Sequence, residues 1–197
     1  MKKQLLVLVW FALAGTAMFT SQAAAQLFTP TFQPPRGGGN IGVYLSDGPG
    51  DFAIEGIFRQ GARTSDLGFR VGLADVGDGL GVLVGADLRN PLALGTAPVD
   101  FALTLGGQGL LGDISGFGFQ GGMSIGSTFR AQGFNFTPYI HPRLALVNEI
   151  DNNRGRDDLD LDVRADIGFD LTFPTFIFRF GANLGRGADF GVGVAFR

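Results

Sequence analysis

Large apolar residues occupy every second position along much of this chain, and that alternation restricts the fold more than any other feature. Between 159 and 171 the odd positions are apolar, while the even positions hold aspartate, arginine or glycine. The same alternation recurs over 65–75 and 98–107. A strand sends successive side chains to opposite faces, whereas a helix would scatter these two sets around its axis. The chain is therefore predicted to be all-β, with one apolar and one polar face on its strands.

Ten segments of the sequence carry this pattern. Most of them approach the roughly 9–11 residues with which a tilted strand crosses a bilayer, whereas strands in globular proteins are most often about 5–6 residues long. We therefore predict a closed antiparallel up-and-down transmembrane β-barrel of about ten strands, with eight strands as an alternative. The segments are 40–46, 51–60, 65–75, 79–89, 98–107, 113–127, 134–148, 159–172, 175–184 and 188–196.

The first residues of the chain have the features of a secretory signal peptide. A basic start, Met1-Lys2-Lys3, precedes an apolar run over 5–13, and Ala23-Ala24-Ala25 provides a cleavage site. The run is shorter than the roughly 20 residues that a spanning helix needs. Residues 1–25 are therefore expected to be removed on export to the outer membrane of a Gram-negative cell. The proline- and glycine-rich residues 26–39 are predicted to form a flexible periplasmic lead-in to a barrel over 40–197.

The composition argues against several classes of partner and cofactor. The chain has no cysteine, which excludes disulfides and thiolate metal sites. Its formal net charge is −3 and both lysines lie in the signal, so nucleic acid is not an expected partner. The aspartate and asparagines at 151–153 lack the glycine and glutamate spacing of an EF-hand. No metal or other cofactor is expected.

The polar face of the predicted strands is rich in glycine, aspartate and arginine. Charges of both signs inside a narrow lumen should pair, because an unpaired buried charge costs several kcal/mol. We predict a structural charge network that largely fills the lumen. The alternative is a narrow polar channel for small solutes, since wide pores need roughly 16–18 strands. The network residues are Glu55, Arg59, Arg70, Asp87, Arg89, Asp100, Arg143, Asp160, Asp162, Arg164, Asp166, Asp170 and Arg179.

The signal peptide, the alternating segments and the ending from Phe190 to Arg197 resemble the small outer-membrane β-barrel proteins, the OmpA-like and porin-like group. In that group an aromatic residue at the end of the last strand is read by the barrel-assembly machinery. The resemblance implies this role for Phe196, which is followed here by Arg197. It also implies outer-membrane lipid and lipopolysaccharide as the surroundings of the protein.

Three other functions are weighed against a membrane barrel of structural or channel role. His141 is the only histidine and lies between Ile140 and Pro142, so it is expected to be a hydrogen-bonded wall residue and the protein not to be an enzyme. A surface adhesin would act through 149–158, which is predicted as the longest outer loop. A secreted soluble β-barrel, or lipocalin-like binding protein, would require the apolar face to point inward.

Overall fold

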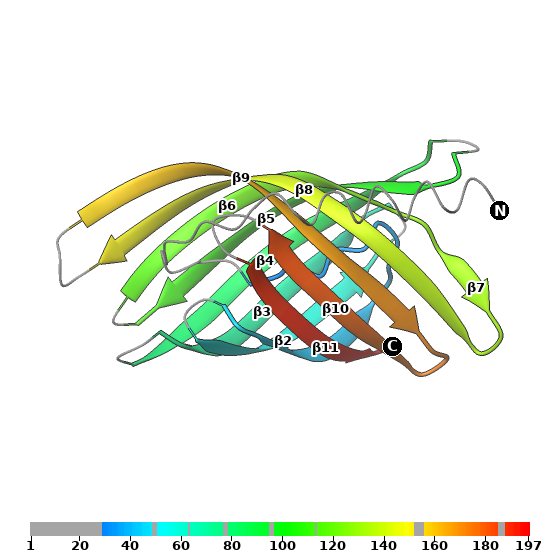
Figure 1. Cartoon of the computed structure of the whole chain (residues 1–197), viewed down its shortest axis with the longest axis horizontal. Helices are drawn as coiled ribbons and strands as arrows, with labels where there is room; N and C mark the ends of the chain where they lie inside the picture. The colour runs from blue at the N-terminus through cyan, green and yellow to red at the C-terminus, as the bar shows by residue number, and fades with distance from the viewer. Residues whose placement is uncertain are drawn as a thin grey trace.

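The computed structural model describes residues 29–197 apart from 49–50, 63, 77–78, 95–96, 113, 152–155 and 185–187. The predicted signal peptide, 1–25, lies outside the described residues. The described part is an all-β, closed antiparallel barrel of ten strands, which confirms the predicted fold class (Figure 1). A search of the described residues for a helix long and apolar enough to span a membrane finds none.

The strands pair antiparallel in chain order, and β1 pairs with β11. Pairing of β6 with β8 completes the ring. The strands are β1 (Asn40–Ser46), β2 (Phe52–Gly61), β3 (Asp66–Asp75), β4 (Leu80–Leu92), β5 (Asp100–Leu111), β6 (Ile114–Gly126), β7 (Phe129–Ala131), β8 (Phe134–Asp151), β9 (Arg156–Thr172), β10 (Phe176–Leu184) and β11 (Ala188–Phe196).

The short strand β7 continues β6 and belongs to the same wall of the barrel. Both pair with β8, and the break between them falls opposite Pro138. The backbone N–H of Ser127 donates to the Pro138 carbonyl at 3.3 Å. Proline has no N–H with which to return that bond. Because β6 and β7 together make one strand of the barrel, the eleven strands form a ten-stranded barrel, as the ten alternating segments predict.

The prediction of a long loop over 149–158 is wrong. β8 has 18 residues and β9 has 17, and they pair as far as Asp151 opposite Arg156. The sequence of this stretch is almost entirely polar, so it lacks the alternation that reveals a strand. The β8–β9 hairpin therefore extends beyond the end of β10, at the upper left of Figure 1, while β8 stays paired with β6 as far as Asp151.

The apolar faces of the strands point outward and the polar faces point into the lumen. In β1 and β2 buried and exposed positions alternate, with Tyr44 and Glu55 buried and Ile41 exposed. Val71 on the outer face of β3 is 60% exposed. A soluble binder of the lipocalin type would need the opposite arrangement. We call the end at which β1 begins and β11 ends the base, and the opposite end the far end.

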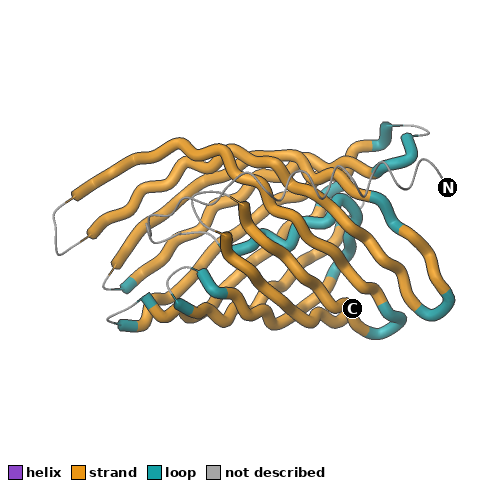
Figure 2. The backbone as a smooth tube through the Cα atoms, viewed as in Figure 1, coloured by secondary structure: helices purple, strands orange, loops and turns teal. Residues whose placement is uncertain are grey.

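Residues 29–35 lie inside the barrel and are here called the plug segment. All seven are buried, and Figure 2 shows the segment as a loop within the ring of strands. The chain then passes through 36–39 at the base and enters β1. A flexible lead-in over 26–39 was expected; its described part from 29 to 35 is instead fixed against the walls by the hydrogen bonds given below.

A cluster of buried apolar side chains lies at the far end of the lumen. This far-end cluster comes from five strands and one turn residue, and small side chains alternate in it with larger ones. Its members are Ala53, Ala74, Val76, Leu83, Leu110, Ala145 and Val147. The polar network and the plug segment therefore occupy the lumen between this cluster and the base.

Candidate functional site

The lumen collects most of the charged residues that the alternation assigns to the polar face. Three of the predicted residues lie elsewhere or only partly inside. Asp100 is half-buried at the base, where its Oδ1 lies 2.7 Å from Arg36 Nη2. Asp160 is exposed on the projecting part of β9, and Asp162 is half-buried there. The buried members are Glu55, Arg59, Arg70, Asp87, Arg89, Arg143, Arg164, Asp166, Asp170 and Arg179.

Arginine–carboxylate pairs connect adjacent or nearby strands across the lumen. Arg59 Nη1 lies 2.6 Å from Asp87 Oδ1, joining β2 to β4. Arg179 Nε lies 3.0 Å from Asp170 Oδ2, joining β10 to β9. Hydrogen-bonded pairs of this kind are strong in a region from which water is excluded, and removal of one partner leaves a buried charge uncompensated. The pairs therefore link strands of the barrel to one another through their side chains.

A further pair involves Asp66, which the sequence analysis did not include. Asp66 Oδ2 accepts from Arg89 Nε at 3.0 Å and from Arg89 Nη2 at 2.5 Å. Asp66 lies in phase with Arg70 on the inner face of β3. The period-2 pattern could have identified it, but its position at the very start of the strand concealed it.

The plug segment adds hydrogen bonds to this network. Thr29 Oγ1 donates to Glu55 Oε1 at 2.6 Å, and Gln33 Nε2 donates to Asp87 Oδ1 at 2.6 Å. Arg89 Nη1 donates to the Pro34 carbonyl at 2.8 Å. Buried polar groups are costly unless they are paired. Side chains of the barrel wall thus have hydrogen-bond partners along most of the plug segment.

Phe32 anchors the plug segment through apolar contact. Its ring is 1% exposed and lies 4.6 Å, centroid to centroid, from that of Tyr44. A Cβ on Gly191 would come within 2.7 Å of the Phe32 ring, so this glycine provides the hollow that the ring fills. Phe32 also has φ of 51°, a left-handed conformation that is uncommon outside glycine. Such backbone strain persists only where the surrounding contacts enforce it.

His141 lies at the centre of a buried hydrogen-bonded cluster. Its Nε2 is 2.7 Å from Thr104 Oγ1, and its Nδ1 is 3.2 Å from Asp166 Oδ2. Thr31 of the plug segment contacts both His141 Nδ1, at 2.9 Å, and Asp166. Arg143 Nη2 donates to the other Asp166 oxygen at 3.0 Å.

A hydroxyl, an imidazole and a carboxylate in this order have the connectivity of a hydrolytic triad. Catalysis also requires that a substrate reach the hydroxyl. Thr104, His141 and Asp166 are all buried, and Thr31 occupies the position beside them. In this arrangement the cluster holds the plug segment, and His141 is a hydrogen-bonded wall residue.

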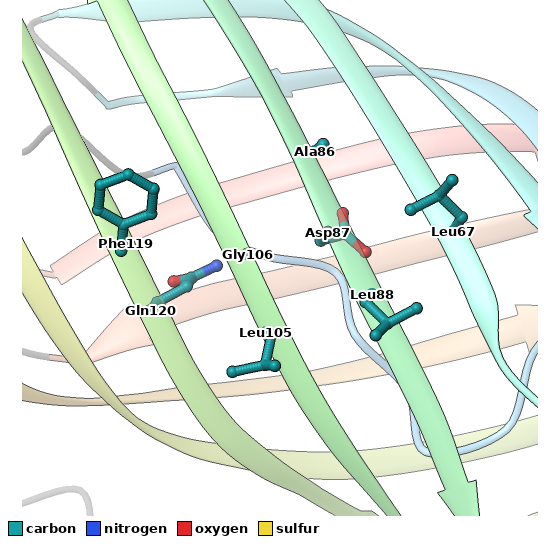
Figure 3. Close-up of a pocket in the computed structure, with 8 residues that line it drawn as sticks. All are labelled: Leu67, Ala86, Asp87, Leu88, Leu105, Gly106, Phe119 and Gln120. Atoms are coloured by element: carbon teal, nitrogen blue, oxygen red, sulfur yellow. The ribbon is translucent and has the colours of Figure 1, made fainter.

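Two hollows border this network. One, of about 370 Å³, opens on the outer wall over β3 to β6. Figure 3 shows leucine side chains and Phe119 around it, with Gly106 at its centre and Asp87 and Gln120 between the strands. The other, of about 120 Å³, lies at the base beside Arg36 and Arg179. Neither hollow is formed by residues of the far-end cluster.

Comparison with known proteins gives likeness only at the level of structure. No protein-family model and no curated protein matches the sequence. A solved structure titled "LpxR from Salmonella typhimurium" is similar over 80% of this chain and 99% of that one, with 8% identity and a TM-score of 0.43. The "KdgM porin" is similar over 80% and 98%, with 9% identity and a TM-score of 0.42. Both are outer-membrane β-barrels. TM-scores this low identify no subfamily and carry no argument about activity.

Proposed function

We propose that this protein is an integral outer-membrane β-barrel with a structural role, whose lumen is closed by its own N-terminal segment. The observation that carries the proposal is the inversion of polarity, with leucine, valine and phenylalanine outside and paired charges inside. In lipid every backbone polar group must be satisfied within the protein, and a closed barrel does so. The outward face is one that lipid tolerates.

The orientation of the barrel in the membrane follows from the different structures of its two ends. The long β8–β9 hairpin extends the far end, as the extracellular side of such barrels is commonly extended. Several phenylalanines of the outer surface contact one another near the base. The rings of Phe173 and Phe176 lie 4.6 Å apart, and those of Phe134 and Phe173 lie 5.9 Å apart. An aromatic girdle of this kind marks a membrane interface. We therefore place the base, with Phe196, on the periplasmic side, where the assembly machinery would engage it.

Closure of the lumen favours a structural role over an open channel. All seven plug residues are buried inside the barrel, and the far-end cluster places buried apolar side chains beyond them. Barrels of about eight strands are just filled by side chains. Ten strands enclose a wider lumen, and the seven plug residues occupy part of that additional space.

Planar-bilayer recording of the refolded protein tests both parts of the proposal. The intact protein should insert and remain silent, whereas a variant lacking 29–35 should show small discrete conductance steps. The control is Gly38→Ser, which changes the connection to β1 at a position where a Cβ meets nothing within 4 Å and leaves the plug residues in place. Steady conductance of the intact protein would refute the closed lumen. Recovery of the mature protein in carbonate washes of membranes, without detergent, would refute membrane integration.

A second candidate function rests on the Thr104–His141–Asp166 connectivity. If the plug segment left the lumen, Thr104 would be exposed to small ester substrates. The variant lacking 29–35 should then hydrolyse a chromogenic acetate ester, and Thr104→Val in that background should abolish the activity. Equal rates for the two variants would remove this candidate.

A further inference from the structure

The polar hollow at the base of the barrel, here called the base pocket, has the features of a binding site for a small anion. Its volume is about 120 Å³. Asn135 on β8, Thr172 on β9 and Ile177 on β10 line it at one level of the sheet. Gly37 and Gly38, in the chain that leads to β1, line its other side. The C-terminus reaches the same end of the barrel, next to β10 (Figure 1).

Three guanidinium groups and one carboxylate line the base pocket. They belong to Arg36, Arg179, Arg197 and Asp170. Arg179 is paired with Asp170, and Arg36 is paired with Asp100. Arg197 forms no ion pair with the side chain of any residue that the structure describes. The side chains around the pocket therefore leave one positive charge, which favours an anion as the ligand.

The carboxylate of Asp170 restricts which anion can enter. Asp170 is 5% exposed, and its Oδ2 accepts from Arg179 Nε at 3.0 Å. Its Oδ1 is also buried and has no hydrogen-bond partner among the described residues. A buried carboxylate oxygen without a donor is costly, and an anion without a proton would be repelled by it. A favourable ligand therefore brings a hydrogen-bond donor of its own to Asp170 Oδ1.

The size and the remaining lining of the base pocket suit a tetrahedral oxyanion. Its volume corresponds to about four water molecules at roughly 30 Å³ each, close to the four oxygens of such an anion. Guanidinium groups match phosphate oxygens in geometry and charge. Asn135 and Thr172 are half-buried and add an amide and a hydroxyl. At neutral pH inorganic phosphate keeps a proton, whereas sulfate and the phosphodiester of a lipid headgroup do not.

We propose that the base pocket binds inorganic phosphate. Arg36 and Arg197 donate to the phosphate oxygens, and the O–H of the phosphate donates to Asp170 Oδ1. Arg179 keeps its bond to the other oxygen of that carboxylate, so the pair that links β9 to β10 stays intact. The amide of Asn135 and the hydroxyl of Thr172 provide further donors to the bound anion.

The test is equilibrium dialysis of the full-length protein, refolded in detergent, against radiolabelled phosphate or sulfate at neutral pH and low salt. Phosphate should bind saturably and at least about tenfold more tightly than sulfate, because sulfate leaves Asp170 Oδ1 without a donor. Dimethyl phosphate, which represents the diester of a lipid headgroup, should displace phosphate only at concentrations about tenfold higher than unlabelled phosphate requires. Equal affinity for phosphate and sulfate would overturn the proposal. Absence of saturable phosphate binding, or displacement by dimethyl phosphate as effective as that by phosphate, would overturn it as well.

Two exposed arginines provide a matched pair of variants. Arg197→Gln removes the guanidinium of the base pocket that has no ion pair and should weaken phosphate binding about fivefold. Arg130 is exposed on β7 and does not line the pocket, so Arg130→Gln should leave the affinity unchanged. Equal weakening by the two variants would show that only the overall charge of the protein attracts the anion, and the proposal would then be wrong.

Asp170→Asn tests the source of the preference for phosphate over sulfate. An amide can donate to sulfate, so the ratio of the two affinities should fall close to one. Heat-modifiable migration in unboiled gels verifies that the variant is folded. A folded variant that keeps the tenfold preference would overturn the role of Asp170. The comparison of anions on the unaltered protein does not depend on whether this variant folds.

Discussion

Replacement of Phe32 by alanine tests whether the plug segment is held by apolar contact or only by its polar bonds. The ring is fully enclosed between Tyr44 and the hollow at Gly191. Loss of a buried phenylalanine side chain costs about 3–5 kcal/mol. The lower value is used below. The left-handed backbone costs alanine about the same 1–2 kcal/mol as phenylalanine and does not offset the loss.

A cost of about 3 kcal/mol raises the fraction of molecules with a displaced plug by roughly 150-fold. A reporter cysteine at Pro30, which is buried in the lumen, reads this fraction through its reaction with a bulky soluble thiol reagent. When displacement is fast and rare, the labelling rate is proportional to the displaced fraction. Phe32→Ala should therefore speed labelling of Pro30→Cys by about 150-fold.

The control is Phe117→Ala, which removes a ring from the outer face of β6 and leaves the lumen intact. It should leave the labelling rate unchanged. Heat-modifiable migration in unboiled gels verifies that both barrels are folded. Labelling of the Phe32→Ala protein within about threefold of its parent would correspond to less than 1 kcal/mol. That result would refute the reasoning, because the polar bonds alone would then hold the segment.

Other variants test the walls and the assembly of the barrel. Arg89→Met leaves the buried Asp66 carboxylate uncompensated and should lower the free energy of unfolding in urea by about 3 kcal/mol. Adding Asp66→Leu should restore most of this stability. If the double variant shows no recovery, the loss does not come from the broken Arg89–Asp66 pair. Gly193→Ala places a Cβ 2.1 Å from a buried tyrosine ring and should prevent refolding, whereas Gly56→Ala, with no neighbour nearer than 3.8 Å, should refold normally. Phe196→Ala should slow the appearance of the heat-modifiable form in cells while refolding in detergent is unchanged; equal kinetics in cells would argue against its role in assembly.

The strands could be predicted because the membrane and the lumen impose opposite polarities on successive residues. The segment 188–196 was predicted with the bounds that β11 has in the structure. The strand residues at the tip of the β8–β9 hairpin were missed because 149–158 is almost entirely polar and does not alternate. A sequence of this kind reads as a loop.

The plug segment was not predicted because its three prolines and the glycines after it read as flexible chain. Its burial depends on the size of the lumen, which is a property of the closed barrel and not of any local sequence. A local signal was nevertheless present. Thr29, Thr31 and Gln33 alternate with apolar residues, and each of the three side chains bonds to a charged or titratable group of the walls.

The plug segment is joined to β1 through only four residues, 36–39, and it therefore behaves as a ligand tethered to its receptor. A short flexible tether holds the effective concentration of such a ligand in the millimolar range. Binding that would be weak between separate molecules then keeps the lumen occupied most of the time. Reopening becomes a unimolecular event whose frequency does not depend on the amount of protein in the membrane. A free peptide with the sequence of 29–35 would compete with the tethered segment only at millimolar concentration.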